Sequence, residues 1–306
     1  MPIFQIKNKK LFQVKEKKFD FEKDLQKITE ENLETIFGLE FIGSEFGIHN
    51  FYIDTLAFDP ETRSFVVIEY KKDQSFSVVD QGLNYLSLML NNKSDFILEY
   101  NEKKKKNLQR GNVDWSQSRV LFIAPSFTPQ QQGAIGFKDL PIELWEVEIY
   151  EDNLVLFNQL KSPEAKESIK TVTKGKAVAT ISREVKEYTI EEHYDKASPK
   201  IKELLDKLRE KILAIDENIK EKPVMYYIGY KVNWYNFVSI HVYKDNLKIE
   251  VRKQKLEKDK EKRFKKYPDS YGYGKTPLWW TYISKDRELD YVLEVIKESY
   301  EAAPDK

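Results

Sequence analysis

The amino-acid sequence predicts an α/β domain, with one central mixed sheet flanked by helices, followed by a smaller α+β domain. A length of 306 residues suits about two domains. Helical and strand-like apolar patterns alternate through residues 1–160, which favours a mixed sheet. Residues 161–195 are rich in Lys, Ser, Thr and Glu, so we interpret them as a charged linker before the second domain at 196–306.

The first domain should open with a hairpin over Phe4–Val14, because two apolar runs flank the polar turn Asn8–Lys10. From Phe21 to Phe37 apolar residues recur every three to five positions, which predicts a helix that Gly38 ends. Two further helices are expected at Ser77–Leu90 and Pro129–Phe137. The expected strands are Leu39–Phe46, Phe51–Phe58, Ser64–Tyr70, Arg119–Ala124, Ile142–Tyr150 and Leu154–Phe157.

The second domain should begin with a helix over Pro199–Ile215, because Ser198 and Pro199 supply an N-cap and a first-turn proline. Strand-like runs follow at Val224–Lys231, Phe237–Tyr243, Leu247–Arg252 and Trp279–Ile283, before a closing helix at Leu289–Tyr300. Lys253–Lys266 is highly charged and ends in cations mixed with aromatics. This stretch suits nucleic-acid contact, although a solvated loop is the alternative interpretation. The nearby aromatic residues form either a stacking platform or part of the core.

Composition narrows the chemistry. The chain has no cysteine, which excludes disulfides, thiolate metal sites and a cysteine nucleophile. Its three histidines are widely spaced, so a histidine-rich zinc site is not indicated. Any bound metal should therefore be held by carboxylate oxygens, which points to Mg²⁺ or Mn²⁺.

The sequence has no apolar stretch long enough to span a bilayer and no apolar signal region, so we expect a cytoplasmic protein without a membrane partner.

The charge is unevenly distributed although the net charge is zero. Residues 1–160 hold 19 Lys and Arg against 25 Asp and Glu, a net of −6. Residues 161–306 hold the remaining 32 and 26, a net of +6. This division suits a metal-using domain beside a polyanion-binding one, but variation in a Lys- and Glu-rich chain explains it equally well.

Three charged residues carry the strongest chemical signal. Asp54 lies on one predicted strand, and Glu69 and Lys71 lie at the end of the next, two positions apart and so on the same face. Each follows apolar residues, where an ionised side chain is costly unless it is paired or binds metal. Carboxylates that hold Mg²⁺ beside a lysine suit phosphodiester hydrolysis. A surface ion pair at a strand end is the alternative.

Four segments extend this pattern into a recognisable order: Glu22–Gln26 with Glu31–Leu33, then Tyr52–Ala57, then Glu69–Lys71, and then Gln81–Tyr85. Together they resemble the PD-(D/E)xK phosphodiesterase superfamily. The closer resemblance is to the nuclease domain of NucS-type, EndoMS-like endonucleases. The likeness is close over about residues 15–95 and looser to about 160. It implies a restriction-endonuclease-like fold for the first domain.

By this resemblance, the metal ligands are Asp54, Glu69 and the backbone carbonyl of Tyr70, and Lys71 is the catalytic lysine. The other implied catalytic residues are Glu22 and Gln81, while Tyr85 and Lys72 would contact substrate. A first-turn glutamate such as Glu22 is also explained by the helix dipole. Relatives often carry Arg where this chain has Tyr52, and the separate N-terminal DNA-binding domain of NucS is missing, so mismatch specificity is not implied. The second domain resembles a small α+β domain of unknown function.

The sequence thus favours a Mg²⁺- or Mn²⁺-dependent nuclease, with DNA favoured over RNA as substrate and a role in repair or in defence against foreign DNA. Related nucleases often pair two sites, so the resemblance also suggests a homodimer. Two alternatives remain: a nucleic-acid-binding regulatory module with little hydrolytic activity, and a protein-interaction adaptor that uses the second domain.

Overall fold

The computed structural model describes residues 2–17, 22–72, 77–137, 140–160, 167–168, 176–268 and 276–303. The chain forms two compact units. The first comprises Met1–Asp59 and Arg63–Lys186, and the second comprises Pro60–Thr62 and Glu187–Lys306. The second unit therefore includes three residues that are distant in sequence from the rest of it.

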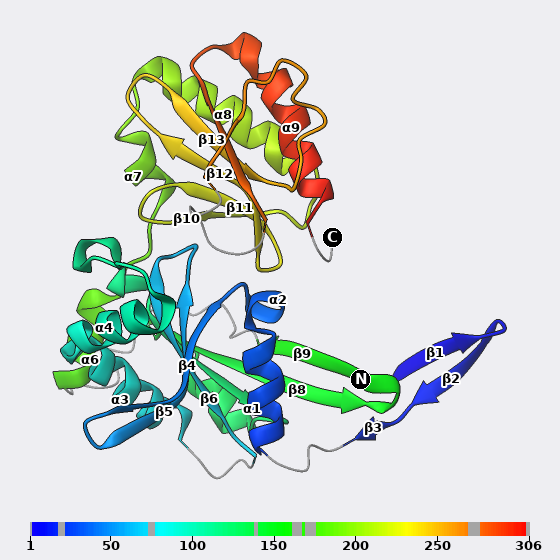
Figure 1. The fold of residues 1–306 in the computed structure, drawn as a ribbon, viewed down its shortest axis with the longest axis vertical. Helices are drawn as coiled ribbons and strands as arrows, with labels where there is room; N and C mark the ends of the chain where they lie inside the picture. Colours follow the sequence, from blue (N-terminus) through cyan, green and yellow to red (C-terminus); the bar gives the residue numbers. More distant parts are fainter. Residues whose placement is uncertain are drawn as a thin grey trace. The chain divides into compact units, whose positions relative to one another are not determined.

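A mixed seven-stranded sheet forms the centre of the first unit (Figure 1). Its strands are β3 (Glu16–Lys17), β4 (Glu40–Ile48), β5 (Phe51–Asp59), β6 (Ser64–Tyr70), β7 (Arg119–Ala124), β8 (Ile142–Tyr150) and β9 (Leu154–Leu160). They lie in the order β3-β8-β7-β6-β5-β4, with β9 also paired to β8. β7 runs parallel to both β6 and β8, and the other pairs are antiparallel. The predicted mixed sheet is confirmed.

Helices pack on both faces of this sheet. On one face, α1 (Glu22–Glu31) and α2 (Leu33–Phe37) share a core with alternate residues of the central strands, such as Ile68 and Ile123. On the other face, α3 (Val78–Asn91) brings Gly82 against Ile142 and Phe122. α4 (Lys93–Lys104) packs its rings against Phe58 and Phe65, and α5 (Pro129–Ala134) and α6 (Lys176–Glu184) contact α3. This two-sided cover explains why every residue of β6 is buried.

Three helical regions of the first unit differ from the sequence prediction. The helix expected over 21–37 is two helices, because the backbone of Asn32 leaves the helical conformation between them. The structure adds α4, which buries only Phe96 and Tyr100, too sparse a pattern to indicate a helix. Lys103 and Lys104 lie in the last turn of this helix, where a cation interacts favourably with the helix dipole. α5 is shorter than predicted.

The stretch expected to be a linker contains two helices, α6 and α7 (Ile190–Tyr194). Both helices are anchored by buried side chains, which are Val178 and Ile181 in α6 and His193 in α7. Residues 161–166 and 169–175 lie outside the described residues.

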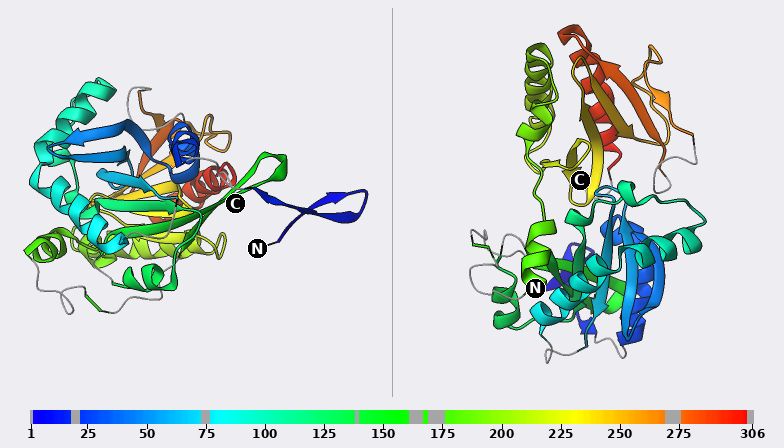
Figure 2. Two further views of the ribbon diagram at one scale, coloured as in Figure 1. Left: turned by 90° about the horizontal axis from the view of Figure 1, so that it is seen from below. Right: turned by 90° about the vertical axis from the view of Figure 1, so that its left-hand side faces the viewer.

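The predicted N-terminal hairpin is confirmed as β1 (Ile3–Lys7) and β2 (Lys10–Val14). Asn8 and Lys9 both have positive φ, at 49° and 64°, as a two-residue hairpin turn of type I′ requires. The hairpin forms its own two-stranded sheet and projects from the rest of the first unit (Figures 1 and 2).

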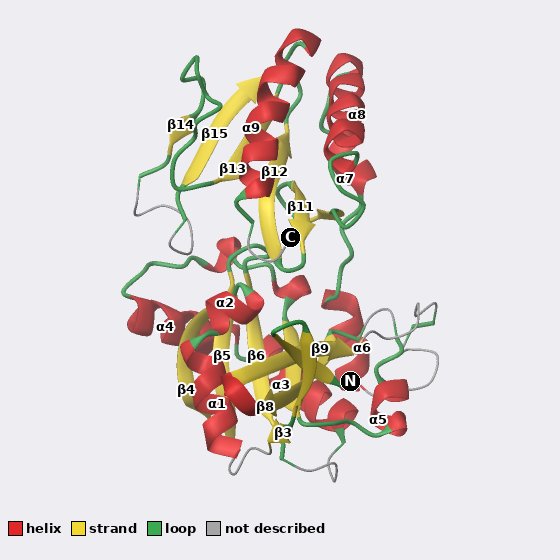
Figure 3. Cartoon of the chain, turned by 90° about the vertical axis from the view of Figure 1, so that its right-hand side faces the viewer, coloured by secondary structure: helices red, strands yellow, loops and turns green. Residues whose placement is uncertain are grey.

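The second unit is a six-stranded antiparallel sheet with helices on one face (Figure 3). The strands are β10 (Lys220–Pro223), β11 (Ile228–Val232), β12 (Tyr235–Val242), β13 (Leu247–Arg252), β14 (Lys265–Lys266) and β15 (Leu278–Ile283). The predicted strand Val224–Lys231 is wrong at its start, since β10 and β11 flank a turn there. α8 (Pro199–Leu213) and α9 (Leu289–Glu301) share a core with Leu247, Ile249 and Val251 of β13.

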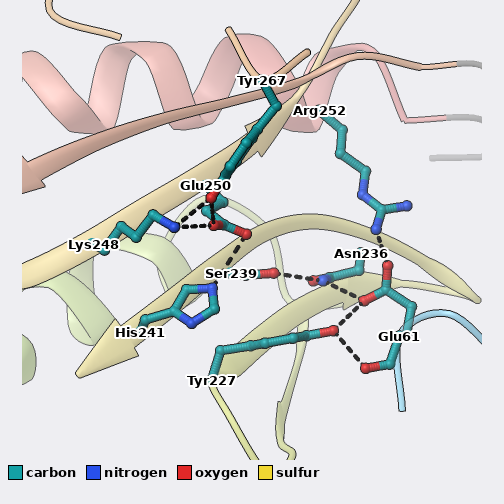
Figure 4. Close-up of polar contacts among 9 residues, drawn as sticks. All are labelled: Glu61, Tyr227, Asn236, Ser239, His241, Lys248, Glu250, Arg252 and Tyr267. Atoms are coloured by element: carbon teal, nitrogen blue, oxygen red, sulfur yellow. Dashed lines mark hydrogen bonds and ion pairs between the residues drawn. The ribbon is translucent and has the colours of Figure 1, made fainter. Parts of the chain in front are cut away.

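Glu61 is a buried carboxylate of the second unit, 8% exposed (Figure 4). Its side chain accepts hydrogen bonds from the Tyr227 hydroxyl at 2.7 Å and the Asn236 amide at 2.6 Å, and it pairs with the Arg252 guanidinium. All of its negative charge is thus compensated by partners from β12, β13 and the turn before β11, as a buried ion requires.

Within the described parts of the chain, no helix combines the length and the apolar character needed to cross a bilayer.

Candidate active site

Asp54, Glu69 and Lys71 come together at one end of the β5–β6 strand pair. Thr55 pairs with Ile68, so Asp54 and Glu69 are neighbours across the two strands and share the face covered by α3. Lys71 follows β6, and its backbone N–H donates to Ile123 of β7. The parallel β7 therefore fixes the main chain on which Lys71 is carried.

Glu69 is a buried acid of this group with a partner on each oxygen. It is 5% exposed, and its two carboxylate oxygens have different partners. Lys71 Nζ lies 2.7 Å from Oε1, and the Tyr85 hydroxyl donates to Oε2 at 2.7 Å. Burial and the charge of Glu69 raise the pKa of the Tyr85 hydroxyl, so the tyrosine keeps its proton and remains the donor in this bond.

Asp54 is held by the backbone. Its Oδ2 accepts from the Tyr70 N–H at 3.0 Å, and its own carbonyl accepts from the Gln26 side chain at 3.0 Å. Burial and the nearby charge of Glu69 raise the pKa of Asp54 to about 6, against the lowering effects of the Tyr70 N–H and of Lys71. Two carboxylates this close together form a place at which a bound cation would be stabilised.

Asp54→Asn should stabilise the metal-free protein, although it removes a site residue. Because the pKa of Asp54 is higher in the folded state than in the unfolded chain, ionisation costs stability as the pH rises from about 4 through 6. Asparagine keeps an oxygen for the Tyr70 N–H but carries no charge. We expect a gain on the order of 1–3 kcal/mol at pH 8 that vanishes at pH 4, measured by urea unfolding in EDTA. An equal effect at both pH values would contradict the raised pKa.

Gln81 and Tyr85 lie one turn apart on α3 and face the sheet together, as their spacing predicts. The Gln81 Oε1 atom is buried and accepts no hydrogen bond from any described residue. A buried acceptor without a donor is costly in a protein interior. Gln81 is therefore a candidate to orient a ligand that donates or is positively charged.

Gly82 sets how closely α3 approaches the site. A Cβ at this position would lie 2.2 Å from Ile142 Cδ1, so the helix must move or Ile142 must repack. We predict that Gly82→Ala lowers the unfolding free energy by roughly 1–2 kcal/mol, despite the better helix propensity of alanine. The matched control is Gly133→Ala on α5, where the added Cβ meets nothing within 4 Å. Equal stability of the two variants in urea unfolding would overturn this packing argument.

Some predicted site residues are not brought into this group. Glu22 is the first residue of α1, which packs on the opposite face of the sheet. Its exposed side chain makes no hydrogen bond or ion pair with the described part of the chain. The side chain of Lys72 is exposed, and the ring of Tyr70 is buried on the α1 face. Only the backbone of Tyr70 lies toward Asp54.

One acid near the site had no signal in the sequence. The pairing of Ser44 with Thr55 and of Phe46 with Ile53 places Glu45 of β4 beside Asp54. Its charge is one of the effects that raise the pKa of Asp54. Glu45 lies on a separate strand and has the unusual φ of 49°, which a local sequence pattern does not indicate.

The residues present fit a hard divalent cation. No cluster of three or more acidic or histidine side chains with metal-binding geometry occurs among the described residues. Asp54 and Glu69 nevertheless supply paired carboxylate oxygens, and the uncoordinated Gln81 oxygen lies on the neighbouring helix. Mg²⁺ binds proteins through one or two carboxylates and keeps several waters, so two acids suffice.

Comparison with known proteins gives the chain a family. A protein from Haemophilus influenzae, described as an uncharacterized protein, is 41% identical over 300 residues, which cover 98% of this chain and 99% of that protein. This chain belongs to the same family. Family members thus share the whole two-unit length, and within it residues 190–303 match the model described as "Domain of unknown function (DUF5655)".

Two solved structures are also similar to part of this chain. One is a repair endonuclease from Pyrococcus abyssi, with 20% identity, 43% of this chain covered and a TM-score of 0.25. The other is EndoMS in a complex with double-stranded DNA, with 15% identity, 44% coverage and a TM-score of 0.25. The match spans about half the length of each solved chain, 50% in both cases.

Proposed function

We propose that the first unit hydrolyses phosphodiester bonds in nucleic acid, with DNA as the preferred substrate and Mg²⁺ or Mn²⁺ as the cofactor. The observation that carries the proposal is the junction of Asp54, Glu69 and Lys71 at the end of two adjacent strands, where Glu69 is buried and bonded on both oxygens. Burying a carboxylate costs free energy unless it is paired, and the cation that pairs with Glu69 is a lysine at the same strand end. The PD-(D/E)xK-like order of these residues agrees with it.

Each residue then has a defined task. Asp54 and Glu69 would hold the cation with the Tyr70 carbonyl, while Gln81 completes the polar lining. When bound, the cation would polarise the phosphate and acidify an attacking water. Glu69 positions the Lys71 ammonium, which neutralises charge on the phosphate oxygens as the water attacks. Tyr85 donates to Glu69 and fixes the direction of its carboxylate.

The proposal is tested by incubating the full-length protein with labelled single-stranded, duplex and branched DNA in Mg²⁺, Mn²⁺ or EDTA. We expect cleavage that requires the metal and that Asp54→Asn abolishes. Cleavage that persists in EDTA, or in Asp54→Asn with Mg²⁺, would reject this site. Binding without cleavage of any substrate would instead favour a regulatory module, and neither binding nor cleavage would favour a protein partner.

The contribution of the α1 acid is open to a separate test. Glu22→Gln should leave cleavage within about threefold of the native rate, because the side chain is exposed and has no contact with the site residues in the described structure. A loss comparable to that of Asp54→Asn would show that α1 moves toward the metal when substrate binds.

A further inference from the structure

The second unit has one sheet face that no described helix covers. α8 and α9 pack against Leu247, Ile249 and Val251 of β13, so the alternate residues Lys248 and Glu250 point to the opposite face. Cross-strand pairing aligns the neighbours on that face: Lys248 with Tyr282, and Glu250 with Trp280. The open face is therefore charged and aromatic, whereas the helix-covered face is apolar.

Four aromatic rings form a continuous row along this face. The centroids of Tyr243 and Tyr282 lie 6.3 Å apart, those of Tyr282 and Trp280 lie 5.4 Å apart, and those of Trp280 and Tyr267 lie 6.0 Å apart. Neighbouring rings meet at angles of 58°, 76° and 44°, so none of these three contacts is a parallel stack. Tyr243 and Tyr282, at one end of the row, are 44% and 47% exposed. Exposed tyrosines side by side are unusual unless they contact a partner.

Cations adjoin the other end of the row. Lys248 Nζ lies 5.4 Å from the Trp280 ring centroid and 5.0 Å from that of Tyr267. Lys265 of β14 lies 5.3 Å from the Trp280 ring centroid. The loop that leads into β14, residues 253–266, holds eight Lys and Arg against three Asp and Glu, a net of +5. Its exposed lysines that form no ion pair with a described carboxylate are Lys255, Lys258, Lys260, Lys262 and Lys265.

A polar network around Glu250 holds Tyr267, the ring at one end of the row (Figure 4). Glu250 accepts from the Tyr267 hydroxyl at 2.5 Å, pairs with Lys248 at 2.8 Å and lies 3.2 Å from His241 Nε2. Burial would raise the pKa of Glu250, but His241, Lys248 and Tyr267 outweigh it and lower the pKa to about 2. Glu250 therefore stays ionised and holds Lys248 and Tyr267 in place beside Trp280.

We propose that this face binds an unpaired polynucleotide strand, with bases on Tyr243 and Tyr282 and phosphates at Lys265 and the basic loop. Flat rings next to unpaired cations match the two chemical parts of such a strand, the base and the phosphate. Paired bases in a duplex present only their edges, so the ring row favours a single strand. The binding site goes beyond the proposed hydrolysis and does not depend on it, because no residue of the first unit contributes.

The test is fluorescence anisotropy of labelled dT15 and U15 with the full chain in EDTA, at 50 and 200 mM salt. The native protein should bind at least one of them and should bind a 15-bp duplex more weakly. Tyr243→Ala/Tyr282→Ala should weaken single-strand binding at least about tenfold, since each stacked base contributes that much. The matched control Tyr226→Ala, an exposed tyrosine outside the row, should bind normally. Comparison of dT15 with U15 tells whether the face prefers the DNA or the RNA probe.

A charge variant gives an independent readout. Lys258→Glu/Lys262→Glu alters only exposed side chains, so folding should be retained, and it should reduce both affinity and its salt dependence. Quenching of tryptophan fluorescence by dT15 should shrink in Trp280→Phe. Equal affinity of the double-tyrosine variant and Tyr226→Ala, or tighter binding of duplex than of single strand, would overturn the proposal. Because the assay contains EDTA, failure of the nuclease proposal leaves these results unchanged.

Discussion

Lys71→Ala should reduce metal-dependent DNA cleavage at least about 100-fold, because it removes the ammonium that Glu69 holds at 2.7 Å. The loss should appear in the single-turnover rate and not in DNA affinity, since one cation among many contributes little to binding. The adjacent Lys72→Ala is the matched control. Its side chain is exposed, and it should change affinity slightly and leave the single-turnover rate nearly intact.

The two lysines therefore separate chemistry from binding. A similar fall in rate for both variants would mean that general positive charge, and not the Glu69-held position, is what matters. Full activity of Lys71→Ala would remove Lys71 from the site altogether. The unfolding midpoints of both variants should be compared first, because Glu69 loses a partner in Lys71→Ala and retains Tyr85.

Arg119→Met should lower the unfolding free energy by about 3 kcal/mol. Arg119 at the start of β7 lies between two acids, with NH1 2.9 Å from Asp59 and Nε 2.8 Å from Glu143. Removing the guanidinium leaves two partly buried carboxylates next to each other without a counter-charge. Urea unfolding of both proteins at pH 7.5 measures the loss.

The control for this change is Arg110→Met, because Arg110 is exposed in a short 3-10 helix of the same unit. It should alter stability by less than about 0.5 kcal/mol. Adding Asp59→Asn to Arg119→Met should recover part of the loss. If the double variant is less stable than Arg119→Met alone, the acids are not the source of the destabilisation.

Local patterns predicted the parts of the candidate site that depend on one strand or one helix. A spacing of two placed Glu69 and Lys71 on one face, and a spacing of four placed Gln81 and Tyr85 together. The mixed sheet followed from apolar runs such as β6 and β7, which need cover on both faces. These features arise from neighbours in the sequence, and the structure retains them.

Other features depend on contacts between distant segments. Glu45 reaches Asp54 only through the pairing of β4 with β5, and the hydrogen bond from Tyr85 to Glu69 needs α3 close to the sheet at Gly82. The exposed position of Glu22 follows from the packing of α1 on the opposite face. The order in which strands pair and the side on which a helix packs are tertiary properties, and periodicity does not contain them.

The membership of Glu61 in the second unit bears on how that unit can be inherited by other proteins. The family model covers 190–303, but the carboxylate that compensates Arg252 comes from 129 positions before its first residue. A gene fragment that encodes only the matched region would carry Arg252 into a new chain without its counter-ion, and Asn236 without one of its hydrogen-bond acceptors. We expect a transplanted copy of the domain to survive only if its new host supplies an acid there or position 252 has become uncharged. We therefore expect an acid at the place of residue 61 to accompany an arginine at position 252 wherever the domain is fused to a new partner.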